Sequence, residues 1–181
     1  VRSPVAELLQ KNWVPFVFGG HLLAEYTLEP HIVLHVDPDT GRCLPLYTET
    51  SFAPLAALQR SAGRISGGAP PLLLPDRAAY LGLAHFKHSQ RMPQLVGTRH
   101  MRYSHLFYTI AATPPFAVSA IGSPRTLPQP HDPTSTPTLQ FAAGMTLDQS
   151  EEFVLVSYGV LDCSMHIVQI PLAEILADLG L

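Results

Sequence analysis

The chain has 181 residues, a length typical of one domain and sufficient to bury a hydrophobic core. Its formal net charge of −3, with scattered lysines and arginines, argues against a nucleic-acid binder, which needs a basic stripe. Hydrophobic residues make up 46% of the chain, so it is not a disordered protein. Its 18 prolines exclude a bundle of long helices, and no apolar run reaches the length of a membrane span.

Short apolar runs separated by turn residues predict a series of β-strands, because Val, Ile, Phe and Tyr favour strands and Gly, Pro, Asp and Ser favour turns. The expected strands are 14–18, 22–28, 31–36, 43–48, 71–74, 80–86, 103–112, 116–121, 139–145, 153–158 and 164–170. Gly19 and Gly20 predict a tight hairpin between the first two, and residues 37–41 (DPDTG) predict a turn.

Helix is expected mainly at the C-terminus. Pro171 suits a first helical position, apolar residues recur at helical spacing from Leu172 to Leu179, and Gly180 suits the end. Residues 55–60 predict one more short helical turn. The segment 128–137 (PQPHDPTSTP) is too polar and proline-rich to pack, so we expect an exposed loop there and a second loop over 91–102.

A faint repeat suggests how the strands are organised. The segments 22–36, 80–110 and 153–170 share one plan of strand, polar site and strand, and each follows another expected strand. Units of this size are typical of propeller blades. We therefore expect an all-β fold in one domain over 1–181: about three blades of a five-bladed β-propeller, with a short C-terminal helix. Because three blades are too few to close a ring and the first residue is Val, we expect the chain to be the C-terminal part of a longer propeller, or to meet its complement in another chain. A β-sandwich is the alternative fold.

Four motifs follow one another along nearly the whole chain. They are residues 11–16 (KNWVPF), residues 67–71 (GGAPP) with 80–85 (YLGLAH), residues 140–145 (QFAAGM) and residues 158–162 (YGVLD). In order and spacing they resemble the five-bladed β-propeller of glycoside hydrolase family 130, which contains β-mannoside phosphorylases and hydrolases. The resemblance implies a ligand site at the central pore, where the inner strands begin.

The resemblance also implies roles for individual residues. Lys11 and His85 match positions that bind inorganic phosphate, and both side chains can donate hydrogen bonds to an oxyanion. Asp162 matches a residue that accepts hydrogen bonds from sugar hydroxyls. Asn12 and Arg64 are added as binding residues from their places beside Lys11 and before a turn expected at the Gly67-Gly68 pair.

The motifs also depart from the family. The residue before His85 is Ala84, where the family often has Tyr, and the general acid, an Asp of an earlier blade, has no counterpart here. We expect that acid in a portion upstream of this sequence, so no catalytic residue is assigned. The expected function is action on a glycoside or oligosaccharide by phosphorolysis, hydrolysis or transfer, with inorganic phosphate as co-substrate and no cofactor. The alternative is a non-catalytic propeller that binds carbohydrate or protein.

The remaining histidines, cysteines and carboxylates predict no metal site and no further catalytic group. His31 and His35 lie four residues apart on an expected strand, about 13 Å, which is too far to share a metal ion, and no HExxH motif is present, so we expect no metal site. The cysteines Cys43 and Cys163 are expected to be free thiols. Glu25 is the one carboxylate inside a strongly apolar strand, and alternation favours an outward-facing position for it. No signal peptide is visible, and the sequence leaves compartment and oligomeric state open.

Overall fold

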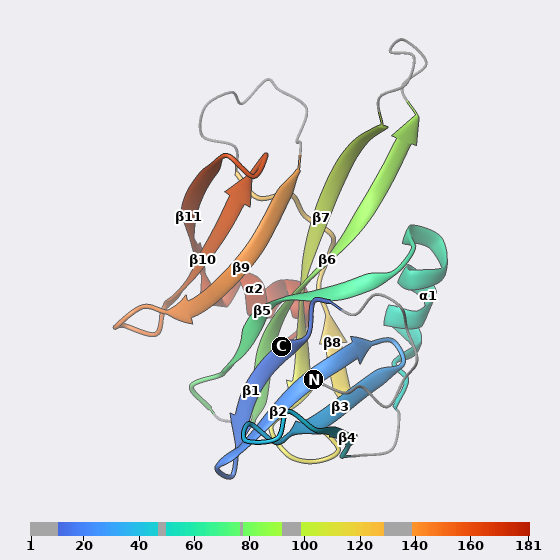
Figure 1. Cartoon of the computed structure of the whole chain (residues 1–181). Helices are drawn as coiled ribbons and strands as arrows, with labels where there is room; N and C mark the ends of the chain where they lie inside the picture. The colour runs from blue at the N-terminus through green and yellow to red at the C-terminus, as the bar shows by residue number, and fades with distance from the viewer. Residues whose placement is uncertain (1–10, 47–49, 77, 92–98, 129–138) are drawn as a thin grey trace.

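The computed structural model describes residues 11–46, 50–76, 78–91, 99–128 and 139–181 (Figure 1). The all-β class is confirmed: most of the described chain lies in three antiparallel sheets, with two short helices. The first sheet contains β1 (Val14–Phe18), β2 (His21–Leu28), β3 (His31–Val36) and β4 (Cys43–Pro45) in that order. The second contains β5 (Ile65–Leu73), β6 (Ala79–Arg91), β7 (Arg99–Ala111) and β8 (Val118–Ile121). The third contains β9 (Gln140–Leu147), β10 (Phe153–Val160) and β11 (Ser164–Pro171); the helices are α1 (Ala53–Ala62) and α2 (Leu172–Leu179).

Two turns in the first sheet form as their sequences predict. Gly19 and Gly20 adopt φ angles of 57° and 80° and join β1 to β2 as a two-residue hairpin, a conformation that glycine adopts without steric cost. In the turn after β3, the Asp37 carboxylate accepts hydrogen bonds from the backbone N–H and the hydroxyl of Thr40. Gly41 completes this turn at a φ of 66°.

The second sheet lies between the other two and is buried on both faces. Leu81, Leu83 and Phe107 pack into one core with β10 of the third sheet and with α2. Phe86 and Tyr108 pack into the other core with β1, β2 and β3 of the first sheet and with α1. Burial on both sides explains why residues 80–86 of β6 and 103–110 of β7 are all buried, without the alternation of exposed residues found on a sheet with one solvated face. The described residues thus form three sheets rather than the two of a simple sandwich, and a third, smaller cluster of buried residues (Tyr26, Leu34 and Cys43) lies on the first sheet.

The first strands of the three sheets meet near the centre of the molecule. β5 contacts β1 on one side and β9 on the other (Figure 1). Gly67 and Gly68 make this approach possible: a Cβ on Gly67 would lie 2.0 Å from Val14 Cγ2, and one on Gly68 would lie 3.0 Å from the Leu83 carbonyl oxygen and 3.2 Å from that of Ala142. The two glycines therefore let one strand pass between two others.

We expect Gly67→Ala to lower the free energy of unfolding by about 1–3 kcal/mol, because an added methyl group in a close-packed site must displace Val14. Urea unfolding followed by circular dichroism measures the change. Gly159→Ala in β10 is the matched control, since its Cβ would meet nothing closer than 3.9 Å, and it should change stability by less than about 0.5 kcal/mol. Equal midpoints for Gly67→Ala and the parent chain would contradict the proposed crowding.

Both helices pack one apolar face onto a sheet. In α2, Leu172, Ile175 and Leu179 are buried, and Gly180 ends the helix in the left-handed conformation, as the sequence predicts. Pro171 lies at the N-cap, one position before the place expected for it. The short turn expected over 55–60 is a ten-residue helix, α1, whose Leu55 is buried.

Some expected boundaries are wrong. The turn expected at the Gly67-Gly68 pair lies inside β5, which begins at Ile65 rather than at Pro71. The loop expected over 91–102 is shorter, because β6 continues to Arg91 and β7 begins at Arg99, and these two residues pair. Backbone pairing tolerates the polar side chains that suggested a loop. The proline-rich loop expected over 128–137 lies, apart from its first residue, outside the described residues. Within the described part of the chain, no helix combines the length and apolar character needed to cross a membrane.

Candidate functional site

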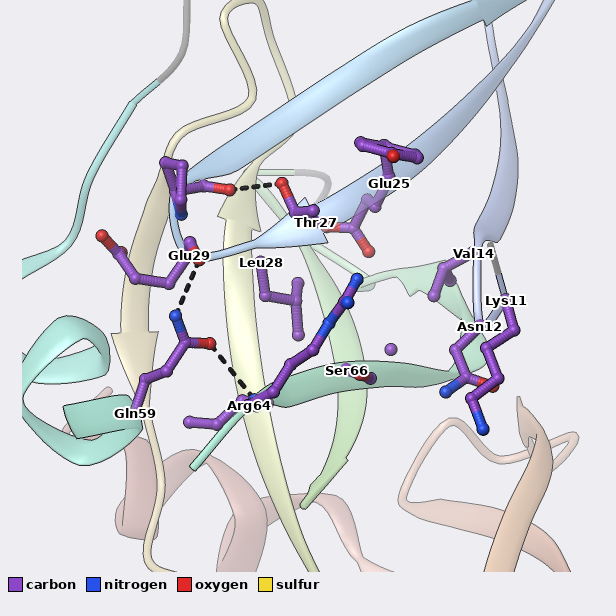
Figure 2. A pocket seen from close by; sticks show the side chains of 14 residues that line it. Lys11, Asn12, Val14, Glu25, Thr27, Leu28, Glu29, Gln59, Arg64 and Ser66 are labelled. Carbon is purple, nitrogen blue, oxygen red and sulfur yellow. Dashed lines mark hydrogen bonds between the residues drawn. The ribbon is translucent and has the colours of Figure 1, made fainter. Parts of the chain in front are cut away.

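Two adjacent hollows lie where the segment before β1 meets the start of β5. The first, here called the Lys11–His85 hollow, has a volume of about 330 Å³ and is lined by Lys11, Asn12, Arg64, Ser66, His85, Phe86 and Lys87. The second, here called the Glu25 hollow, has a volume of about 340 Å³ and is drawn in Figure 2. Its polar lining side chains are those of Lys11, Asn12, Glu25, Tyr26, Thr27, Glu29, Gln59, Arg64 and Ser66. Because Lys11, Asn12, Arg64 and Ser66 line both, the two hollows are parts of one depression between the first and second sheets.

The structure brings together four of the five residues that the sequence singles out. Lys11, Asn12, Arg64 and His85 all line the Lys11–His85 hollow, although they come from three separate segments. Lys11 and Asn12 directly precede β1, and Arg64 directly precedes β5. His85 lies on β6 in register with Ser66 of β5. The shared location follows from the central meeting of β1 and β5.

The Lys11–His85 hollow is positively charged. Lys11, Arg64 and Lys87 line it, and none of the described residues in its wall is acidic. Lys87 was not singled out by the sequence; its Nζ lies 5.4 Å from the ring centre of Tyr103, a cation–π distance. Three cationic side chains around one depression favour an anionic ligand.

His85 lies where the three sheets meet. Its ring packs on Phe141 of β9 with centroids 4.9 Å apart, and its Nε2 lies 3.4 Å from Asn12 Nδ2. Burial, and then the charges of Lys87 and Lys11, lower the pKa of His85 to about 4, so the ring is neutral near pH 7. An amide NH2 group only donates, so Nε2 accepts from Asn12. In this arrangement His85 orients the Asn12 amide rather than adding a positive charge to the hollow.

A second buried histidine stands beside it. His105 of β7 pairs in register with His85, and its Nε2 accepts a hydrogen bond of 3.3 Å from the Ala142 N–H of β9. Burial, and then the neighbouring His85, lower the pKa of His105 to about 4. The two neutral rings thus connect the second sheet to the segment before β1 and to the third sheet.

In the Glu25 hollow, Glu29 and Gln59 hold the surrounding elements together. The Glu29 carboxylate accepts hydrogen bonds from the Ser51 hydroxyl and from the Phe52 N–H at the start of α1. Gln59 donates to the Glu29 carbonyl at 2.8 Å and accepts from the Ile65 N–H at 3.2 Å (Figure 2). These bonds fix α1, the β2–β3 turn and the start of β5 around the hollow.

Glu25 is the buried carboxylate of the same hollow. Its residue exposure is 2%, and its Oε1 lies 3.0 Å from Nε2 of the buried His31. Its Oε2 accepts a hydrogen bond of 2.5 Å from the Tyr108 hydroxyl of β7. The outward-facing position expected for Glu25 is therefore wrong. The physical reason is that both faces of β2 are covered: Glu25 lies on the face of Leu23, which packs with the second sheet, and Tyr26 packs on the opposite face.

Tyr108 reaches Glu25 because a glycine lies opposite it. Gly82 pairs with Tyr108 in register, and a Cβ at that position would lie 2.2 Å from the tyrosine ring. Burial first, and then the charge and hydrogen bond of Glu25, raise the pKa of Tyr108 far above its ordinary value. Tyr108 is therefore a hydrogen-bond donor throughout the physiological range, and Glu25 is the acceptor.

Asp162 lies outside both hollows. It is exposed in the turn between β10 and β11, where it and Leu161 have φ angles of 53° and 56°. The Cys163 N–H donates to the Val160 carbonyl across this turn at 3.1 Å. Because Val160 pairs with Ser164, three residues, 161–163, connect the two strands as a short hairpin loop. The sugar-binding role of Asp162 stays a prediction, and the described residues give it no place beside the other four.

The described residues also bear on the expectations for metal ligands and cysteines. No group of three or more His, Cys, Asp or Glu side chains there is placed to hold a metal ion. Cys43 is buried and Cys163 is exposed, and both are free thiols, as the sequence predicts.

Two components of this depression, Lys87 and the partners of Glu25, were not predicted from the sequence. A signal for Lys87 is its position two residues after His85, which on a strand places both side chains on one face. Glu25 interrupts the apolar run 22–28, but no local pattern links it to Tyr108, which is 83 positions away.

The comparisons with known proteins add no relative. No protein-family model matches this chain, and no curated protein matches it either. The resemblance to glycoside hydrolase family 130 therefore rests on the four motifs alone.

Proposed function

We propose that the chain is part of a β-propeller that acts on glycosides and binds phosphate or a phosphate-bearing sugar in the depression between its first two sheets. The observation that carries this proposal is the location of Lys11, Asn12, Arg64 and His85 around one cationic hollow. Lys11 and His85 lie 74 positions apart in the sequence, so their common location depends on the tertiary fold.

The arrangement of the sheets supports the propeller. Each sheet is a meander of consecutive antiparallel strands, and the first strand of the second sheet contacts the first strand of each neighbour. Blades of a propeller pack face to face in this way around their inner strands. The three sheets would then be consecutive blades.

The site chemistry supports binding of an oxyanion. Lys11, Arg64 and Lys87 supply positive charge, and Asn12 and Ser66 supply neutral hydrogen-bond donors. In phosphorolysis, a phosphate oxygen attacks the anomeric carbon while an acid protonates the leaving oxygen. The residues named here would hold and orient the phosphate.

Lys11→Ala is expected to weaken inorganic phosphate binding about 10- to 100-fold, because one charge-assisted hydrogen bond contributes about 1.5–3 kcal/mol. Isothermal titration calorimetry at constant ionic strength measures the dissociation constant. Arg42→Ala is the matched control: Arg42 is an exposed cation in the β3–β4 turn and lines neither hollow. Equal weakening by both substitutions would show a general charge effect and would contradict a phosphate site at Lys11.

The reaction is tested by incubating the protein with β-mannobiose and related oligosaccharides, with and without phosphate. Release of a sugar 1-phosphate supports phosphorolysis, whereas turnover independent of phosphate supports hydrolysis. Failure to turn over any glycoside, with phosphate binding intact, would contradict the enzymatic part of the proposal.

A non-catalytic binding module is the second candidate. The observation that favours it is the placement of the carboxylates: Glu25 and Glu29 line only the Glu25 hollow, and both already have hydrogen-bond partners within the chain. Glycoside cleavage commonly uses a pair of carboxyl groups on either side of the scissile bond. A module that only binds carbohydrate or protein needs none.

A further inference from the structure

We propose that Glu25 is a specificity-determining residue of this depression: its carboxylate accepts a hydrogen bond from a hydroxyl group of an organic phosphate whose phosphate group lies among Lys11, Arg64 and Lys87. The inference rests on the proposed function, because it takes the cationic hollow as the phosphate site. It adds the residue that distinguishes a hydroxylated ligand from other phosphate esters.

The two hollows are continuous with one another. Lys11, Asn12, Arg64 and Ser66 line both the Lys11–His85 hollow and the Glu25 hollow. A ligand whose anionic group is held by these residues therefore has a second space of about 340 Å³ beside it, and Glu25 lies in the wall of that space (Figure 2).

The other carboxylate in this wall, that of Glu29, already accepts hydrogen bonds at both of its oxygens. Both Glu29 oxygens accept hydrogen bonds from the segment that begins α1. Gln59 likewise bonds to Glu29 and Ile65. Glu29 and Gln59 thus build the hollow, whereas the partners of Glu25 are two side chains, those of His31 and Tyr108.

The Glu25 carboxylate has more hydrogen-bond acceptor positions than its partners in the chain use. An ionised carboxylate has about four acceptor positions on its two oxygens. His31 lies at one oxygen and Tyr108 donates to the other, which leaves positions for a ligand. Of the described residues in the wall, neither His31 nor Tyr108 is one, so both act behind Glu25 as positioning residues.

Burial of Glu25 beside His31 costs free energy. The Glu25 side chain has 1% exposure and that of His31 has 2%. Burying such a pair is costly, and a well-packed apolar substitute is often as stable or more stable. A fixed, buried carboxylate in the wall of a hollow is thus better explained by ligand recognition than by stability, and hydroxyl groups are donors that such a carboxylate recognises.

The test compares two phosphate esters of similar size, a hexose phosphate and cyclohexyl phosphate, which lacks ring hydroxyls. Titration calorimetry of the intact chain gives both dissociation constants. We expect the hexose phosphate to bind at least tenfold more tightly. In Glu25→Gln this preference should fall to about threefold or less, with the affinity for cyclohexyl phosphate changed less than twofold.

Two further variants keep the test decisive. If Glu25→Gln does not fold, Glu25→Asp retains the charge but withdraws it from the hollow by one methylene group, and it should reduce the preference as well. Tyr108→Phe, which leaves the hollow wall unchanged, should reduce the preference without abolishing phosphate ester binding. A purely structural role for Tyr108 would leave the ratio of the two affinities unchanged.

Failure of the inference and failure of the proposed function give different results. Equal affinities for the two esters in the parent chain, or an unchanged ratio in both the Gln and the Asp variant, would overturn the role of Glu25 and leave the phosphate site standing. Absence of binding by either ester and by inorganic phosphate would overturn both.

Discussion

Acidification from pH 7 to pH 4 is expected to lower the free energy of unfolding by about 3–6 kcal/mol through His85 and His105 alone. The pKa of each ring is about 4 in the folded chain, against an ordinary value of 6.5 that we take for the unfolded chain. A difference of about 2.5 pH units corresponds to about 3 kcal/mol for each group. Together the two groups therefore account for a loss of up to about 6 kcal/mol.

The direction of the effect follows from proton uptake. As the pH falls through about 6.5, the unfolded chain binds protons on these histidines while the folded chain does not, so the unfolded state is favoured. The loss continues to about pH 4, where the folded rings begin to bind protons too, and these two groups cause no further loss below that value. Above pH 7 both rings are neutral in either state and contribute no pH dependence.

Urea unfolding at half-unit pH intervals measures this slope, and substitutions assign it. His105→Gln places a non-titrating acceptor where Nε2 accepts from the Ala142 N–H, and His85→Gln does the same for Asn12. Each variant should remove roughly half of the slope between pH 6.5 and pH 4. His21→Gln, at an exposed histidine, is the matched control and should leave the slope unchanged. A slope that survives in the His85→Gln, His105→Gln double variant would contradict this origin.

The all-β class and most strands and turns were predictable because their signals are local. Alternating apolar residues, the Gly19-Gly20 hairpin and the glycine after α2 each act within a few residues, and the structure places strands and turns there. Strand boundaries were harder to predict where backbone pairing continues through polar residues, as it does from Lys87 to Arg91 of β6. The centre of the molecule was only partly predictable: Gly67 and Gly68 suggested a turn, whereas their actual role is to let β5 pass between two other strands.

The site was predictable to the extent that it depends on motifs. Lys11, Asn12, Arg64 and His85 were singled out and lie together. The roles of their side chains depend on tertiary surroundings that a motif does not contain. His85 suggested a donor to phosphate, but burial leaves it neutral and bonded to Asn12. Glu25 suggested a solvent-facing residue, but packing on both faces of β2 and a distant tyrosine make it part of the interior.

Tyr108→Phe is expected to lower the free energy of unfolding by about 3 kcal/mol, because it removes a hydrogen-bond donor from a buried carboxylate oxygen while leaving the ring in place. Hydrogen bonds to charged groups contribute about 1.5–3 kcal/mol, and a buried charged acceptor left without its donor adds to the loss. Tyr158→Phe is the matched control: its ring is also buried, but its hydroxyl donates to the neutral Pro128 carbonyl at 2.7 Å. Its expected cost is about 1 kcal/mol. Denaturant unfolding at pH 7 measures both. Equal losses would mean that the Glu25 carboxyl is no stronger an acceptor than a peptide carbonyl, and the argument for a charged, oriented Glu25 in the wall of the hollow would fail with it.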